Sequence, residues 1–144
     1  MKRLTAECEM VFELLEACDE KLGSEPNNME IVILRGMLHN IVQAYDEAIA
    51  DLNKVIKNMP EDERGYYLRS DCHFNKGEYD LAKRDYLRAL KIQFKDDKEF
   101  VKGHTEKVIS EAIIENEEEK ADIKKILEHE KKRVLLSYIP QLEG

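Results

Sequence analysis

Two histidines, His39 and His73, are the first residues of this chain whose spacing suggests chemistry, because they lie 34 positions apart. Imidazole is a common zinc ligand, but a zinc site needs three or four converging ligands. No cysteine or carboxylate is spaced to complete a site with these two histidines. We therefore expect both to pack against their surroundings, and the sequence predicts no metal site.

The other reactive side chains form no recognisable catalytic group. The acidic run Glu117–Glu119 is more typical of a solvated helix start than of an acid/base pair or a calcium site. Cys8, Cys18 and Cys72 are odd in number and lack metal-ligand spacing, which indicates reduced thiols that serve mainly in packing. The sequence contains no glycine-rich phosphate loop, nucleophile elbow or His-Glu-x-x-His motif. We expect no enzymatic activity and no cofactor.

Composition limits the classes of partner. The chain has 144 residues, of which 42% are hydrophobic and 38% charged, and this balance with only six glycines and three prolines is typical of a helical protein. Its net charge of −8 argues against nucleic acid and against an anionic membrane surface as ligands. No apolar stretch is long enough to span a membrane. Acidic residues near the N-terminus interrupt the apolar core that a secretory signal would need, which argues against such a signal. We expect a cytoplasmic protein.

The 34-residue spacing of the two histidines is part of a longer sequence repeat. Eight residues of the segment 29–62 recur identically 34 positions later, and Pro26 and Pro60 keep the same spacing upstream of each unit. A fixed period of this length is typical of a helix–turn–helix solenoid, whose units bury their apolar faces only against one another. The identical residues are Leu34, Arg35, His39, Tyr45, Asp46, Ala48, Asp51 and Lys57, which recur as Leu68, Arg69, His73, Tyr79, Asp80, Ala82, Asp85 and Lys91.

The repeat resembles the tetratricopeptide repeat family over residues 29–96. Small residues stand at Gly36 and Ser70, where the two helices of a unit approach, with Ala48 and Ala82 expected opposite them. We expect the turns of the two hairpins near Gln43 and Gly77. The remaining positions that carry the resemblance are Tyr45, Leu52 and Pro60 in the first unit and Tyr66, Gly77, Tyr79, Tyr86, Ala89 and Leu90 in the second.

The resemblance implies an all-α fold, an α-α superhelix of about six to seven helices in a single domain over 1–144. We expect repeats at 29–62 and 63–96, an N-terminal capping helix at 4–22 and a C-terminal helical cap at 97–139. The caps would cover the exposed ends of the stack, since two repeats rarely suffice alone.

The resemblance also implies a protein-interaction adaptor or scaffold that holds a peptide or helix in a concave groove. The groove positions of each unit are spaced i, i+4, i+7, so that they share one helical face. Their apolar character would suit an amphipathic helix or apolar peptide. The predicted peptide-binding residues are Ile33, Met37, Asn40, Tyr67, Asp71 and Phe74.

One subgroup of the family grips acidic chaperone tails with a clamp of Lys, Asn and Arg side chains. This chain has Ile33, Met37, Leu68 and Asp71 at the matching positions. Because Asp71 would repel a carboxylate, the sequence argues against such a tail as the ligand.

Three alternatives remain open from the sequence. The groove residues could pack beneath residues 98–138 folded back across them, so that the groove is filled core. The C-terminal helices could also mediate self-association as a homo-oligomer, since their apolar stripe is long for a cap. A docking piece of a larger assembly is a third hypothesis, and the sequence does not identify the protein partner.

Overall fold

A computed structural model describes residues 2–103 and 125, with side chains for residues 9–103 and 125. All five of its named elements are helices, and residues 98–103 are helical as well. The all-α fold class is therefore confirmed, while the rest of the expected C-terminal cap lies outside the described residues. The helices are α1 Lys2–Ser24, α2 Met29–Ile41, α3 Tyr45–Asn58, α4 Glu63–Asn75 and α5 Tyr79–Gln93.

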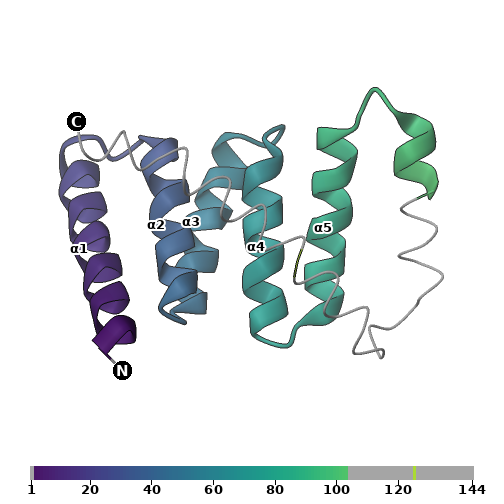
Figure 1. Cartoon of the computed structure of the whole chain (residues 1–144). Helices are drawn as coiled ribbons and strands as arrows, with labels where there is room; N and C mark the ends of the chain where they lie inside the picture. Colours follow the sequence, from purple (N-terminus) through teal and green to yellow (C-terminus); the bar gives the residue numbers. More distant parts are fainter. Residues whose placement is uncertain (1, 104–124, 126–144) are drawn as a thin grey trace.

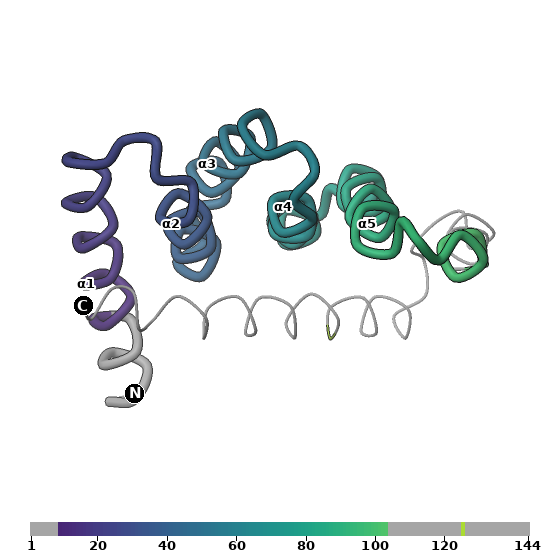
Figure 2. Tube along the Cα trace, turned by 90° about the horizontal axis from the view of Figure 1, so that it is seen from above, coloured from purple at the N-terminus to yellow at the C-terminus, as the bar shows by residue number. Residues whose placement is uncertain are grey.

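The helices stack in chain order as helical hairpins. α2 pairs with α3 and α4 pairs with α5, while α1 packs on α2, and α4 contacts both α3 and α2. Figures 1 and 2 show the helices side by side, with α2 and α4 along one side of the row and α3 on the other. The expected superhelix of stacked hairpins is thus the architecture that the described residues adopt.

The two hairpin turns have the same geometry. Gln43 and Gly77 hold equivalent positions in successive repeats, and both adopt a positive φ, 65° and 81° respectively. The next N–H in each turn donates 2.8 Å to the carbonyl of His39 or His73. The turns therefore fall where the sequence predicts them, although the first uses a non-glycine residue in a left-handed conformation that favours glycine.

The starts of α2 and α4 are also equivalent. Asn28 accepts a hydrogen bond from the N–H of Ile31 at 3.4 Å, and Asp62 accepts one from the N–H of Arg64 at 3.0 Å. These side chains satisfy amide groups that the first turn of a helix leaves without partners. The two caps occupy the same repeat position, so local sequence sets the same helix start in both units.

Close contact between α2 and α3 explains the small residue at Gly36. A Cβ added there would lie 3.2 Å from Cγ of Leu52 and 3.4 Å from Cβ of Asp51. The nearest opposing atoms therefore belong to these residues rather than to Ala48, which the sequence suggests. At the equivalent place in the second unit, the hydroxyl of buried Ser70 donates to the carbonyl of Ala82 at 2.6 Å.

The buried apolar residues form two clusters. The larger joins α1, α2 and α3 to Leu68 and Cys72 of α4, and the smaller joins α4 to α5 around Tyr67, Tyr86 and Leu90. Cys18 and Cys72 both lie in the larger cluster at 0% exposure. Their burial agrees with the packing role expected for these two cysteines.

Candidate functional site

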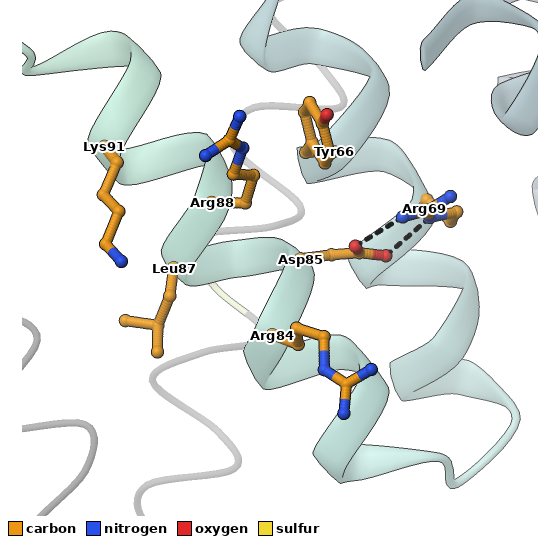
Figure 3. Close-up of a pocket in the computed structure, with 7 residues that line it drawn as sticks. All are labelled: Tyr66, Arg69, Arg84, Asp85, Leu87, Arg88 and Lys91. Carbon is orange, nitrogen blue, oxygen red and sulfur yellow. Dashed lines mark hydrogen bonds and ion pairs between the residues drawn. The ribbon is translucent and has the colours of Figure 1, made fainter. Parts of the chain in front are cut away.

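Each hairpin contains the same bidentate ion pair. Arg35 donates to both carboxylate oxygens of Asp51 at 3.0 and 2.8 Å, and Arg69 donates to both oxygens of Asp85 at 2.7 Å (Figure 3). The hydrogen bond to its aspartate raises the pKa of each arginine above the ordinary value. The sequence shows these four residues only as identities between the two repeats, whereas their pairing appears in the folded hairpins.

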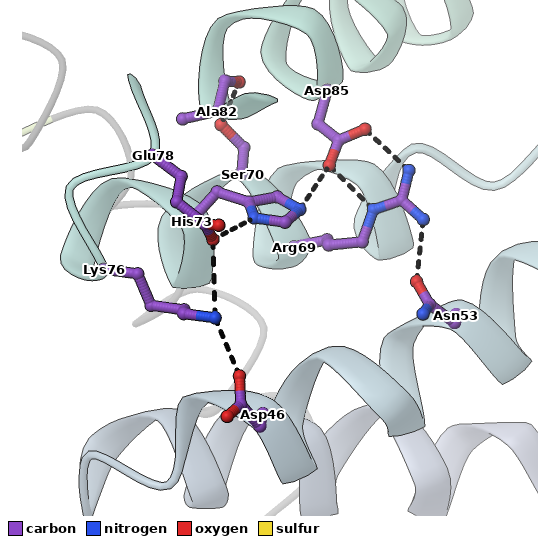
Figure 4. A network of polar contacts seen from close by, with 9 residues as sticks. All are labelled: Asp46, Asn53, Arg69, Ser70, His73, Lys76, Glu78, Ala82 and Asp85. Atoms are coloured by element: carbon purple, nitrogen blue, oxygen red, sulfur yellow. Dashed lines mark hydrogen bonds and ion pairs between the residues drawn. The ribbon is translucent and has the colours of Figure 1, made fainter. Parts of the chain in front are cut away.

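The same arginines also reach the preceding helix. The remaining guanidinium nitrogen of Arg35 donates to Asp19 of α1 at 3.0 Å, and that of Arg69 donates to Asn53 of α3 at 2.8 Å (Figure 4). Asp19 and Asn53 are separated by one repeat period, so α1 stands toward the first hairpin as α3 stands toward the second. The arginines thereby join successive layers of the stack.

The two histidines border these ion pairs. Nε2 of His39 lies 4.0 Å from Asp51, and Nε2 of His73 lies 3.7 Å from Asp85. Nδ1 of His73 is 3.0 Å from Glu78 (Figure 4), and this hydrogen bond is the main cause that lowers the pKa of Glu78. Within residues 9–103, no group of three or more His, Cys, Asp or Glu side chains is arranged to hold a metal ion. The histidine contacts lie within their own hairpins.

The predicted groove residues lie on α2 and α4, and most of them are buried. Ile33, Met37, Asn40, Tyr67 and Asp71 are at most 5% exposed. Phe74 is half-buried and packs its ring against Tyr79 at a centroid distance of 5.2 Å. In the folded chain, this surface is therefore closed to solvent over most of its area.

The polar members of the groove meet across the two helices. The amide of Asn40 on α2 donates to the carboxylate of Asp71 on α4, and Asn75 donates to Asn40 at 3.1 Å. The hydroxyl of Tyr67 donates to Gln93 of α5, while its ring lies edge-on to Tyr86 at 5.9 Å. The structure thus brings Asn40 and Asp71 together, whereas Tyr67 is engaged by the second hairpin.

Ile33 and Met37 belong to the larger core cluster. The four consecutive residues from Ile31 to Leu34 point to all sides of α2 because successive helical positions differ by about 100°. All four are at most 2% exposed. Such enclosure agrees with the nearly all-round apolar sequence of α2, and the peptide-binding role of its residues stays a prediction.

A second feature, which sequence reasoning missed, lies between α4 and the outer face of α5. A hollow of about 370 Å³ opens there, and most of its lining side chains are basic (Figure 3). The available signal was the spacing of Arg84, Arg88 and Lys91 at i, i+4, i+7, which places all three on one helical face. The lining residues are Tyr66, Arg69, Arg84, Asp85, Leu87, Arg88 and Lys91.

Stacked helical hairpins in a single repeating register, with equivalent turns and ion pairs, define a helical-repeat solenoid. The comparison with protein families agrees with this geometry. Residues 63–96 match the family model described as "Tetratricopeptide repeat". The second hairpin is therefore similar to a tetratricopeptide repeat, a family of protein-interaction modules.

Two curated proteins resemble parts of the chain. It is 30% identical over 56 residues to peptidyl-prolyl cis-trans isomerase FKBP4 of Bos taurus, a match that covers 39% of this chain and 12% of that protein. It is 27% identical over 93 residues to DnaJ homolog subfamily C member 7 of Homo sapiens, a match that covers 61% of this chain and 19% of that protein. The matches thus span less than a fifth of either relative. No solved structure matches the chain.

Neither relative's full activity follows from so short a match, because function depends on a site rather than on a shared fold. What the repeat supports is a protein-interaction role. As for membranes, none of the helices in the described part of the chain combines the length and the apolar character that a membrane crossing requires.

Proposed function

We propose that this chain is a non-catalytic protein-interaction adaptor or scaffold, whose α2–α4 surface holds an amphipathic helix or apolar peptide. We define this surface by Ile33, Met37, Asn40, Tyr67, Asp71 and Phe74. The observation that carries the proposal is the contact between Asn40 and Asp71, because it joins the predicted groove positions of both repeats into one continuous surface. A cytoplasmic location belongs to the same proposal.

The chemistry of the surface limits its occupant. Ile33 and Met37 supply apolar area on α2, and Phe74 supplies the half-buried aromatic edge on α4. Apolar side chains at i, i+3, i+4 and i+7 of a partner helix fit such a surface. Methionine adapts its shape to different side chains, and the hydrogen-bonded pair of Asn40 and Asp71 adds a polar point to this otherwise apolar surface.

Self-association is the second candidate function, with the surface filled by the chain's own C-terminal segment. The observation that favours it is the near-complete burial of Ile33 and Met37 in the folded chain. A buried surface accepts a partner only if whatever covers it is displaced. The C-terminal helices that the sequence predicts lie outside the described residues, so this candidate rests on burial alone.

A photo-crosslink at Phe74 tests both candidates. This side chain is half-buried at the edge of the surface, so a benzoylphenylalanine fits there with less disturbance than at fully buried Met37. The full-length protein, mixed from isotope-labelled and unlabelled copies, is irradiated in native lysate and the crosslinked peptides are sequenced. Phe12, which is 55% exposed on α1, provides the matched control position.

We expect Phe74 to crosslink a different polypeptide that Phe12 does not reach. A crosslink to residues 104–144 of the same copy or of a second copy, which the isotope labels distinguish, would favour the second candidate instead. Crosslinks confined to α1–α5 of the same copy would refute the surface as an interaction site in either form.

A further inference from the structure

The basic hollow between α4 and α5 lies apart from the α2–α4 surface. Its α5 residues Arg84, Leu87, Arg88 and Lys91 lie on the face of α5 turned away from the buried Ala82 and Ala89, and Leu87 also packs against the edge of the smaller core cluster. Figure 3 shows these side chains projecting from α5 while Tyr66 and Arg69 come from α4. A ligand here therefore approaches the outer side of the second repeat.

Charge is the distinctive property of the hollow. Its lining has four cations and one carboxylate, a net charge of +3, in a chain whose net charge is −8. The carboxylate of Asp85 is held by both donors of Arg69. Arg84, Arg88 and Lys91 are exposed and have no acidic partner among the described residues.

An aromatic and an aliphatic side chain complete the lining. The ring of Tyr66 lies 5.8 Å from the guanidinium of Arg69 and 5.9 Å from that of Arg88. These contacts orient the planar guanidinium of Arg88 beside the ring. Tyr66 and Leu87 are both half-buried, so they present apolar area next to the free cations.

The first repeat does not reproduce this combination. Val32 stands in place of Tyr66, Ala50 in place of Arg84 and Asn53 in place of Leu87. Lys54, which corresponds to Arg88, donates instead to the carbonyl of Pro26 at 3.0 Å. The hollow is therefore not a general consequence of the repeat pattern.

We propose that the hollow formed by Tyr66, Arg84, Leu87, Arg88 and Lys91 binds an acidic peptide segment of a protein partner. Two arginines match carboxylates through paired donors and a lysine adds a point charge. The half-buried Tyr66 and Leu87 fit an apolar side chain between the acidic residues. Nucleic acid is disfavoured because the cations cover only one small area of an acidic chain.

The probe is the peptide acetyl-Glu-Glu-Leu-Glu-Glu-amide, titrated into the isotope-labelled full-length protein at low salt and followed by amide chemical shifts. We expect saturable shifts confined to Tyr66, Arg69 and residues 84–91. The double variant Arg84→Gln/Arg88→Gln should weaken binding at least about tenfold, because charge-assisted hydrogen bonds are lost. Exposure of both arginines means that the fold is retained, which the amide spectrum itself verifies.

The matched control is Lys54→Gln/Lys57→Gln, which removes the same charge from two exposed positions of α3 in the first repeat and should leave the affinity within about twofold. If both double variants weakened peptide binding equally, the binding would depend only on the net charge of the protein, and the proposed site would be overturned. Absence of saturable binding, shifts centred elsewhere, or tighter binding of a single-stranded oligothymidylate of equal charge would also overturn it. A phosphoserine peptide that binds while the glutamate peptide does not would overturn the assignment of the ligand as a carboxylate-bearing peptide.

Discussion

Glu30 and Arg64 hold equivalent positions in successive repeats, and they face each other across α2 and α4. The two outer nitrogens of Arg64 donate to the two carboxylate oxygens of Glu30, each at 2.8 Å. The same guanidinium donates to the cap residue Asp62 at 2.7 Å. The side chain of Arg64 therefore links the start of α4 both to its own capping residue Asp62 and, through Glu30, to α2 of the preceding hairpin.

Arg64→Gln should lower the free energy of unfolding by about 1 kcal/mol, because partly exposed ion pairs contribute little singly but this arginine serves two. Urea unfolding followed by circular dichroism measures the loss. Arg84→Gln is the control, since Arg84 is exposed and has no acidic partner among the described residues. An equal loss in both variants would show that the Arg64 pairs add nothing.

The stability of the repeat should fall in acid through Asp62. Burial acts to raise the pKa of the Asp62 carboxyl, but the hydrogen bonds and charge of Arg64 outweigh it and hold the pKa below the ordinary 3.8. Because the folded pKa is the lower one, the stabilisation is complete above the ordinary value and is lost as the pH falls through the folded value. Asp62→Asn keeps a capping oxygen and removes this titration. Between about pH 5 and pH 2, it should therefore lose less stability than the parent protein.

Gln43→Gly should stabilise the protein by up to about 1 kcal/mol, because Gln43 has a φ of 65° and glycine adopts this region without the Cβ penalty. Gly77→Gln, at the equivalent turn with a φ of 81°, should destabilise it by a similar amount. Thermal unfolding of both variants checks the pair. A change of the unfolding temperature in the same direction in both variants would contradict the turn geometry.

Asp85→Asn should cost about 2 kcal/mol, since it leaves the guanidinium of Arg69 without its bidentate partner in a largely buried place. The double variant Arg69→Met/Asp85→Asn should recover part of this loss, because no unpaired charge then remains. A double-mutant cycle in urea gives the coupling energy. Additive losses would contradict a direct interaction.

Cys18 should resist alkylation in the native protein. The pKa of this thiol is raised to about 11, mainly because the side chain is buried, and the charge of Asp19 adds to the effect. Since the thiolate is the reactive form, iodoacetamide at neutral pH should label Cys18 only after the chain unfolds. Mass spectrometry of the labelled peptides separates it from Cys8, and rapid native labelling of Cys18 would refute its burial.

Local sequence determined much of this fold. The turns at Gln43 and Gly77 and the caps at Asn28 and Asp62 depend on residues adjacent in the chain. The constant repeat period then makes the second hairpin a copy of the first. For that reason, the all-α class and the positions of the hairpin turns could be predicted without coordinates.

Tertiary structure decided what each repeated position contacts. The sequence marks Arg69 and Asp85 only as repeated residues, and it places Met37 on a groove face without showing that the side chain is 1% exposed. It likewise gives the helical spacing of Arg84 and Arg88, but not the hollow beside Tyr66. Helical periodicity specifies which side chains share a face, whereas burial and pairing depend on how closely neighbouring helices approach, a property of the packed chain as a whole.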